Sequence, residues 1–239
     1  MEPTSRPRVK ICCIKSIDEA WVAIRHGADA LGLVSQMPSG PGVIAESLIA
    51  AIARTIPPGV ASFLLTSRPS AAAIIDQQRR LRVNTVQICD RLPDGALAAL
   101  RDALPGVSLV QVVHVTGEHS IDEAVEAAAV VDGILLDSGN PSLAIKELGG
   151  TGRRHDWQIS RRIRESVDVP VYLAGGLRPD NVAEAIDAVG PFALDLCSGV
   201  RTNGQLDEAK LAAFFQAVES TNLPSSATAA SDGTAKRRD

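Results

Sequence analysis

The amino-acid sequence predicts an α/β protein that folds as a single (β/α)8 (TIM) barrel. Short segments rich in apolar and β-branched residues alternate along the 239-residue chain with segments whose apolar residues recur every three or four positions. The alternation repeats eight times, and near-continuous apolar strands separated by helices are typical of a parallel sheet covered on both faces. Eight repeats favour a closed barrel over an open, doubly wound sheet, which usually has fewer strands.

The expected elements follow one another with short connections. Strands are expected at residues 9–14, 30–35, 60–66, 85–89, 109–115, 133–137, 169–174 and 192–197. Helices are expected at residues 17–26, 44–54, 71–82, 94–103, 121–130, 157–165, 181–189 and 207–218. Capping signals support three of these helices, because Asp18 can open the first, Asp156 precedes the sixth and Pro179 suits the first turn of the seventh.

The last part of the chain differs in composition from the rest. Residues 1–218 carry the eight repeats, whereas residues 219–239 are rich in Ser, Thr, Ala and Gly, show no periodicity and end in basic residues. A segment of this composition cannot bury enough apolar surface to fold. We therefore expect one barrel domain followed by a disordered C-terminal tail.

Composition and charge exclude several classes of function. Aromatic residues make up only 3% of the chain and the formal net charge is −4, so both the stacking side chains and the positive field typical of nucleic-acid binding are missing. The sequence contains no run of about 18 apolar residues and no apolar stretch behind its basic N-terminal residues, which argues against a membrane span and a secretory signal. We expect a cytoplasmic protein that acts on small molecules.

The four cysteines and four histidines form no metal-binding motif. Cys12 and Cys13 are adjacent, Cys89 and Cys197 lie far from them in the sequence, and neither a CxxC pair nor a Cys/His pair with ligand spacing occurs. We therefore expect four free thiols in a reducing cytosol and no bound metal.

A barrel of this class carries its functional site at the C-terminal ends of its strands. Gly175 and Gly176 follow the expected seventh strand, and Gly199 follows the eighth. Glycines let backbone N–H groups approach an anion closely, and the ends of strands seven and eight form the recurring phosphate site of this fold. These turns therefore predict a phosphate site, and the alternative is that they are only tight turns.

Two strand ends carry residues suited to proton transfer. Cys12 lies at the end of the first strand and Asp137 at the end of the sixth, on opposite walls of the expected barrel. A thiolate can act as a base, and a partly desolvated carboxyl can deliver a proton near neutral pH. Together they indicate an isomerase, although a core cysteine and a capping aspartate would look the same. Because side chains alternate along a strand, we expect Cys13 to point away from Cys12.

Several short motifs occur in order between about residues 8 and 218. They are VKIC near the N-terminus, GADALGLV on the second strand, NTVQI on the fourth, LLDS on the sixth, GGTG and DW in the sixth loop, and then AGGLRPDNV and PFALDLCSGV. In these motifs the chain resembles phosphoribosylanthranilate isomerase of tryptophan biosynthesis. Several motifs together are specific, whereas any one alone is not.

The resemblance implies an Amadori rearrangement, in which N-(5′-phosphoribosyl)anthranilate becomes the 1-deoxyribulose 5-phosphate isomer without a metal or cofactor. By the resemblance, Cys12 is the general base that takes the proton from C2′ of the sugar. Asp137 is the general acid that protonates the ring oxygen. The resemblance also implies that the phosphate is held by the backbone of Gly175, Gly176, Ser198 and Gly199. It implies that the loop residues Thr151 and Gly152 close over the substrate.

The chain departs from the family pattern at three strand ends. Pro41 occupies the position of an arginine that in the family meets the anthranilate carboxylate. Cys13 stands where the family usually has glycine, and Cys89-Asp90 stands where it has His-Gly. These departures change the residues that recognise the aromatic carboxylate, whereas the residues for phosphate binding and proton transfer are kept.

An isomerase without that arginine needs another cation, since a buried carboxylate without a partner is unfavourable. Arg153 and Arg154 are the candidates, because the sixth loop folds over the same mouth and a guanidinium suits a carboxylate. Alternatively, Arg153 replaces the family's lysine and Arg154 is solvated. Two other functions also remain open, an isomerase or lyase for a different sugar phosphate and a non-catalytic phosphate-binding barrel. The sequence carries no indication of the oligomeric state.

Overall fold

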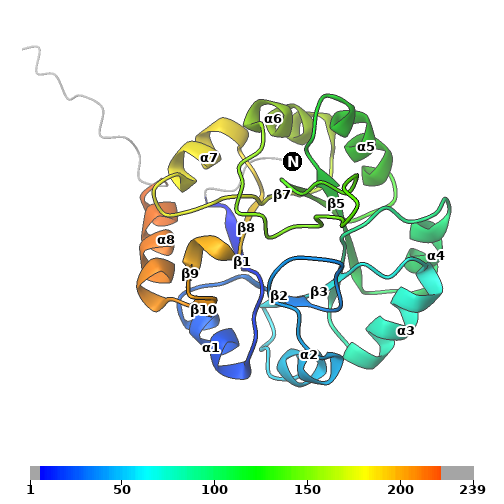
Figure 1. The fold of residues 1–239 in the computed structure, drawn as a ribbon, viewed down its shortest axis with the longest axis horizontal. Helices are drawn as coiled ribbons and strands as arrows, with labels where there is room; N and C mark the ends of the chain where they lie inside the picture. The colour runs from blue at the N-terminus through cyan, green and yellow to red at the C-terminus, as the bar shows by residue number, and fades with distance from the viewer. Residues whose placement is uncertain (1–5, 222–239) are drawn as a thin grey trace, which may run out of the picture.

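Eight parallel strands hydrogen-bond in sequence order and close into a barrel, because β1 pairs with both β2 and β8 (Figure 1). The structure is a computed structural model that describes residues 6–221. The strands are β1 (Arg8–Ile11), β2 (Ala30–Val34), β3 (Ala61–Thr66), β4 (Thr85–Ile88), β5 (Ser108–His114), β6 (Gly133–Asp137), β7 (Val171–Leu173) and β8 (Ala193–Leu196). The predicted (β/α)8 barrel is confirmed.

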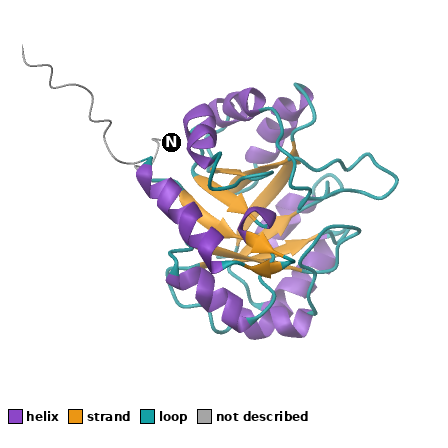
Figure 2. Cartoon of the chain, turned by 60° about the vertical axis from the view of Figure 1, so that its left-hand side comes forward, coloured by secondary structure: helices purple, strands orange, loops and turns teal. Residues whose placement is uncertain are grey.

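Helices enclose the strands on the outside of the barrel (Figure 2). They are α1 (Ile17–Arg25), α2 (Glu46–Ala53), α3 (Ala71–Leu81), α4 (Ala96–Ala103), α5 (His119–Ala128), α6 (Trp157–Ser166), α7 (Val182–Val189) and α8 (Glu208–Ser220). Three short elements that the sequence did not predict lie between β8 and α8. They are the 3-10 helix η1 (Ser198–Val200) and the antiparallel hairpin of β9 (Arg201–Thr202) and β10 (Gln205–Leu206).

Every predicted strand and helix is present. These elements differ from the prediction only in where they begin and end and in which residues cap the helices. Ser16 caps α1 in an extended conformation, so the predicted cap at Asp18 is wrong, and Asp18 instead lies in the first turn. Asn181 precedes α7, and Pro179 lies in a turn before it rather than in the first helical turn. The cap at Asp156 is confirmed, since its carboxylate accepts a hydrogen bond from the first turn of α6.

The predicted boundary between barrel and tail falls slightly too early. Helix α8 continues through Ser220, two residues beyond the predicted end at Val218. Most of the predicted tail, residues 222–239, lies outside the described residues, so its disorder stays a prediction. In the described part of the chain, no helix has the length and apolar character needed to cross a membrane.

Side chains alternate between the two faces of the closed sheet and build two apolar layers. The larger layer lies between strands and helices and consists mainly of Val, Ile, Leu and Ala. The smaller layer fills the barrel interior and includes Phe63, Val112 and Leu135. Cys12 belongs to this inner cluster. The alternation that packs the interior therefore also directs a predicted site residue inward.

The barrel interior holds a buried ion pair between its first and last strands. Lys10 Nζ on β1 lies 2.8 Å from Asp195 Oδ1 on β8, and the two side chains are 0% and 7% exposed. The ammonium also lies over the ring of Phe63, 5.1 Å from its centroid. Burial by itself lowers the pKa of Lys10, but attraction to Asp195 and to Cys12 outweighs burial and raises that pKa. Lys10 is therefore a fixed positive charge at the seam where the barrel closes.

Breaking this pair leaves a buried charge without a partner. We expect Asp195→Asn to lower the free energy of unfolding by about 3–5 kcal/mol, because the Lys10 ammonium then has no carboxylate in the interior. Denaturant titration measures the change. The control is Glu165→Gln, which breaks the exposed Arg161–Glu165 pair on α6 and should cost less than about 0.5 kcal/mol. Equal losses in the two variants would contradict the structural role of the buried pair.

Candidate active site

A cavity opens at the C-terminal ends of the strands, where a barrel of this class carries its site. About 710 Å³ of space free of protein atoms lies within it, including open solvent at its mouth. The predicted site residues on its wall are Cys12, Asp137, Thr151, Gly152, Gly175, Gly176, Ser198 and Gly199. Arg154 is the one predicted site residue that does not line it. Among residues 6–221, no three His, Cys, Asp or Glu side chains are arranged to hold a metal ion.

Cys12 continues the β1 pairing by one residue, since its N–H donates to Leu196 O of β8 at 2.8 Å. Gly32 on β2 provides the space in which its side chain lies. A Cβ at Gly32 would fall 2.8 Å from Cys12 Sγ and 3.2 Å from Lys10 Nζ. Thiol and ammonium are therefore within the roughly 6 Å over which opposite charges interact appreciably. A negative charge on Cys12 would thus face a fixed cation.

Asp137 ends β6 and is 7% exposed. Its Oδ1 accepts a hydrogen bond from Ser138 N at 2.7 Å, and a Cβ on Gly149 would lie 2.7 Å from its Oδ2. Burial raises the pKa of this carboxyl above its ordinary value, although the Ser138 hydrogen bond and the neighbouring His114 partly oppose the rise. Asp137 therefore keeps its proton to higher pH than an exposed aspartate and can deliver it inside the cavity.

Cys13 lines the same cavity, so the expectation that it points away from Cys12 is wrong. The reason is its backbone, which is left-handed with φ 63° and breaks the alternation of the strand. The Cys13 thiol lies 3.7 Å from the carbonyl oxygen of Pro41, and Gly42 packs directly against its Cβ. Glycine adopts this conformation more easily than any other residue, which fits the family's usual glycine at this position.

Arg201 supports this strained turn, and no sequence motif pointed to it. The side chain is 6% exposed and its Nη1 pairs with Glu19 Oε1 of α1 at 2.9 Å. Its Nη2 donates to Cys13 O at 2.5 Å, and the more distant Cys12 O lies at 3.5 Å. The only available sequence signal was its position just beyond the Ser198-Gly199 turn, in a stretch without periodicity. Arg201 thus links η1 and the hairpin to the end of β1.

The glycine turns after β7 and β8 have no room for side chains. Gly176 has φ 65°, and a Cβ there would lie 3.0 Å from Gly152 O in the sixth loop. A Cβ on Gly199 would lie 2.0 Å from Leu177 O. Backbone atoms and short side chains therefore form this end of the cavity, which lets main-chain groups come close to a ligand. This arrangement suits an anion such as a phosphate.

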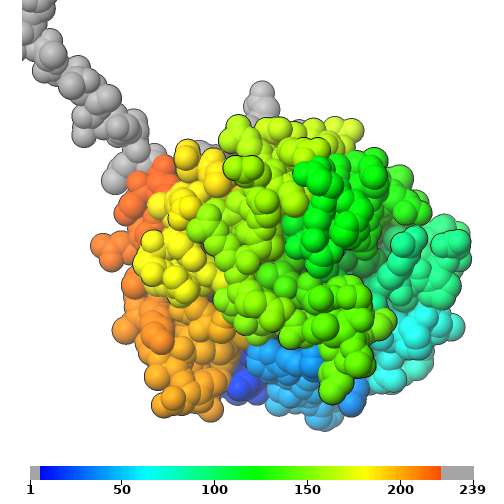
Figure 3. Space-filling view, turned by 45° about the horizontal axis from the view of Figure 1, so that its top comes forward, coloured from blue at the N-terminus to red at the C-terminus, as the bar shows by residue number. Residues whose placement is uncertain are grey.

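The long loop between β6 and α6 covers the cavity from one side. Thr151 Oγ1 and Ser138 Oγ lie 2.7 Å apart, which ties the loop to its own strand. Ser39, in the loop after β2, donates to Lys146 O at 2.6 Å and joins the two loops. In the space-filling view, the green-to-yellow atoms of this region meet the blue atoms of the early chain (Figure 3). Both loops therefore form one continuous rim.

One part of the cavity wall, the apolar rim, carries mainly apolar side chains. It includes Met37, Pro41, Leu65 and Leu148, and none of the described residues on the cavity wall is a Lys, Arg or His. Gln87 on β4 also lines the cavity, and its buried Oε1 has no hydrogen-bond partner. This end of the cavity can therefore enclose an apolar ring and offer it one acceptor.

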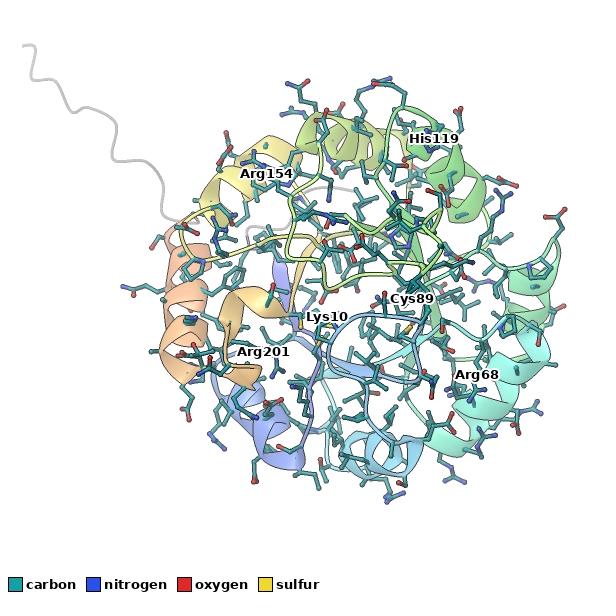
Figure 4. All side chains as sticks on the ribbon, viewed as in Figure 1. Lys10, Arg68, Cys89, His119, Arg154 and Arg201 are labelled. Carbon is teal, nitrogen blue, oxygen red and sulfur yellow. The ribbon has the colours of Figure 1, made fainter. Side chains whose placement is uncertain are left out.

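The structure does not bring Arg154 to the cavity. Its guanidinium stacks on Trp157 of α6, 3.4 Å from the ring centroid, and pairs with Glu184 of α7 at 2.8 Å. Figure 4 shows Arg154 among the outer helices, whereas Lys10 and Cys89 lie near the barrel centre. Arg153 is exposed and pairs with Glu147. Neither of the two candidates for replacing the missing arginine, Arg153 and Arg154, therefore lines the cavity.

Lys146 is a cation at the rim that sequence reasoning missed. Its Nζ lies 2.5 Å from Asp90 Oδ2. Asp90 directly follows Cys89, which lines the cavity. Its backbone carbonyl is held by Ser39, and Leu148, two residues further on, lies in the cavity wall. The side chain is 46% exposed, so it can turn toward a ligand. Spacing alone could not find it, because its position depends on the meeting of three loops.

Comparisons with known proteins agree with one another. The family model for N-(5′-phosphoribosyl)anthranilate (PRA) isomerase matches residues 9–217. N-(5′-phosphoribosyl)anthranilate isomerase from Methanocella arvoryzae is 36% identical over 208 residues, covering 87% of this chain and 95% of the relative. The protein of the same name from Halobacterium salinarum is 36% identical over 221 residues, covering 91% and 98%. The chain therefore spans nearly the full length of these relatives.

Solved structures give the same result. Phosphoribosyl anthranilate isomerase from Thermotoga maritima aligns with a TM-score of 0.74 and 29% identity, covering 90% of this chain and 99% of that one. A phosphoribosyl anthranilate isomerase in complex with reduced 1-(o-carboxyphenylamino)-1-deoxyribulose 5-phosphate aligns with a TM-score of 0.72 and 27% identity, over the same shares of the two chains. The fold, the cavity and these matches together establish that the chain belongs to the phosphoribosylanthranilate isomerase family.

Proposed function

We propose that this chain isomerises N-(5′-phosphoribosyl)anthranilate by an Amadori rearrangement, with Cys12 as general base and Asp137 as general acid. The observation that carries the proposal is that both side chains line one cavity. Mere binding of a phosphate ligand would require neither a buried acid nor a thiol beside a fixed cation. The reduced deoxyribulose phosphate held by a related structure belongs to the chemical class that this cavity would take.

Ring opening is the first step, and Asp137 supplies its proton. Burial holds the pKa of Asp137 above its ordinary value, so a protonated carboxyl is available to the furanose ring oxygen. Protonation of this oxygen lets the C1′–O bond break and leaves the anthranilate nitrogen doubly bonded to C1′. As pH rises through the raised pKa, Asp137 loses this proton and turnover should fall.

Proton abstraction is the second step, and it belongs to Cys12. Its sulfur takes the proton from C2′, and the electrons of that bond move toward the cationic nitrogen to give an enol amine. Lys10 beneath the sulfur stabilises the negative charge of the thiolate. The enol then becomes the 2′-ketone as C1′ gains a proton and the 2′-hydroxyl loses its proton to solvent. A reducing cytoplasm suits such a thiol base.

The two ends of the substrate meet different parts of the cavity. We place the phosphate at the Gly175-Gly176 and Ser198-Gly199 turns, where backbone N–H groups would hold it, and assign Thr151 and Gly152 to the loop above it. The anthranilate ring then lies against the apolar rim, and Lys146 is the cation we assign to its carboxylate. The partner is a small phosphorylated sugar, with no nucleic acid or membrane involved.

The acid and base assignments are tested with purified Cys12→Ala and Asp137→Asn. We expect each to lower kcat on N-(5′-phosphoribosyl)anthranilate by roughly 10²–10⁴-fold, the usual contribution of a positioned acid or base, with a smaller effect on KM. The parent protein should also restore growth to a tryptophan-requiring strain that lacks this isomerase. Full turnover in either correctly folded variant would rule out that residue's role.

The phosphate position is tested with Gly176→Asp, which adds a Cβ and a like charge beside the proposed anion. We expect KM and the inhibition constant of inorganic phosphate to rise at least about tenfold, equivalent to ~1.4 kcal/mol. The control is Gly106→Asp, because Gly106 also has positive φ but has no atom within 4 Å of its Cβ position. If Gly176→Asp binds phosphate as the parent does, the anion site lies elsewhere.

The carboxylate partner is tested with Lys146→Met and Arg154→Met in parallel. We expect Lys146→Met to raise KM about tenfold with kcat kept, because contact with the carboxylate is equal in the ground and transition states. Arg154→Met should leave both constants unchanged, since its guanidinium is held by Trp157 and Glu184. The reverse pattern would return the role to Arg154. An inactive parent protein would instead indicate a different aglycone.

A further inference from the structure

We propose that Cys197 and Cys13 form an oxidation site at the floor of the cavity, where a hydroperoxide converts the two thiols reversibly into a disulfide. The oxidation step does not depend on the proposed function. Only its effect on turnover does.

The barrel seam brings these thiols together. Ile11 on β1 pairs with Leu196 on β8, so the residues that follow them, Cys12 and Cys197, leave the two strands side by side. The left-handed backbone of Cys13 then turns its side chain back into the same cavity. Cys12, Cys13 and Cys197 all line this cavity, and hydrogen bonding of the Cys13 thiol to the other two raises the pKa of Cys13. Three sulfurs thus meet at the ends of two neighbouring strands.

The surroundings give Cys197 and Cys13 different reactivity. The hydrogen bond from Cys13 and the charge of Arg201 lower the pKa of Cys197, although burial opposes them. Hydrogen bonds to Cys12 and Cys197, together with burial, raise the pKa of Cys13, so Cys13 stays a thiol. Arg201 Nε is buried without an oxygen or nitrogen partner, which leaves a donor free for a sulfur anion. Cys197 is therefore the nucleophile and Cys13 the resolving thiol.

Access also separates Cys197 from the other thiols. Cys12, Cys13 and Cys89 are buried, whereas Cys197 is only partly buried and lines a cavity open to solvent. A small peroxide can enter a cavity of this size. The thiolate with a lowered pKa is thus also the more accessible one, as expected for a sulfur that reacts selectively.

The chemistry balances in two steps. The Cys197 thiolate attacks one peroxide oxygen, the O–O bond breaks, and the sulfur is oxidised to sulfenic acid while hydroxide leaves. The Cys13 thiol then attacks the Cys197 sulfur. An S–S bond forms, the S–O bond breaks, and the thiol proton leaves with the hydroxyl as water. A dithiol reductant reverses the reaction by thiol–disulfide exchange.

The disulfide would act on the proposed catalytic site through its neighbours. Cys13 directly follows Cys12, and Cys197 directly precedes Ser198 at the phosphate turn. Drawing the two sulfurs into a covalent bond shifts both neighbours, and displacements of about 1 Å can cost on the order of 10²-fold in rate. Peroxide should therefore switch turnover off and a dithiol should restore it.

The test treats the reduced full-length protein with a small excess of hydrogen peroxide, blocks the remaining thiols by alkylation and analyses tryptic peptides by mass spectrometry. We expect the peptide of residues 11–15 cross-linked to the peptide of residues 165–201. The cross-link should persist in Cys12→Ala and disappear in Cys13→Gly, in which glycine suits the left-handed backbone. No cross-link in the parent, or one that depends on Cys12 instead of Cys13, would overturn the proposal.

Turnover provides a second readout with a matched control. Peroxide should inactivate the parent and Cys89→Ser at equal rates, and dithiothreitol should restore both. Cys197→Ser should be inactivated about tenfold more slowly, because the reactive thiolate is gone. Equal inactivation of Cys197→Ser would assign the sensitivity to another thiol. If the protein proves inactive on the proposed substrate, the cross-linking result still decides the existence of the site.

Discussion

The ion pair between Lys10 and Asp195 is the interaction on which the rest of the site depends. A buried ammonium is tolerated only beside a carboxylate, so the pair requires β1 and β8 to meet with both residues facing inward. That requirement sets the inward and outward positions along both strands. Cys12 and Cys197, each two residues beyond a member of the pair, then face inward at the mouth of the barrel. The chemistry at the mouth is thus a consequence of how the barrel closes.

The barrel could be predicted from the sequence because its helices and strands are indicated by the spacing of apolar residues, a pattern visible within a few residues. The position of Cys12 and Asp137 at the mouth could be predicted for a related reason, since the fold places strand ends around one mouth. The hairpin of β9 and β10 escaped prediction because no apolar pattern forms it. It depends on the tertiary contact of Arg201 with Glu19, and contacts of this range leave no local signal.

Loop residues were harder to place than strand residues for the same reason. Arg154 and Arg153 lie in a loop that covers the mouth, yet one turns outward onto Trp157 and the other pairs with Glu147. Stacking on an indole and pairing with a carboxylate compete directly with a role in the cavity. Lys146 reaches the rim only because Ser39 holds its carbonyl and Asp90 holds its ammonium. Neither partner is near it in sequence.

Backbone strain, a buried cation and a reactive thiol occur together around Cys13 at the mouth of the barrel. A residue other than glycine at positive φ costs on the order of 1–3 kcal/mol, which the hydrogen bond from Arg201 to its carbonyl helps to offset. The hydrogen bond from Cys13 lowers the pKa of Cys197, and the same guanidinium lowers it further. Arg201 therefore helps to stabilise cysteine at position 13, where the family usually has glycine, and also lowers the pKa of the nearby Cys197. Strain and thiol reactivity here depend on one side chain, so a substitution of Arg201 would alter both together.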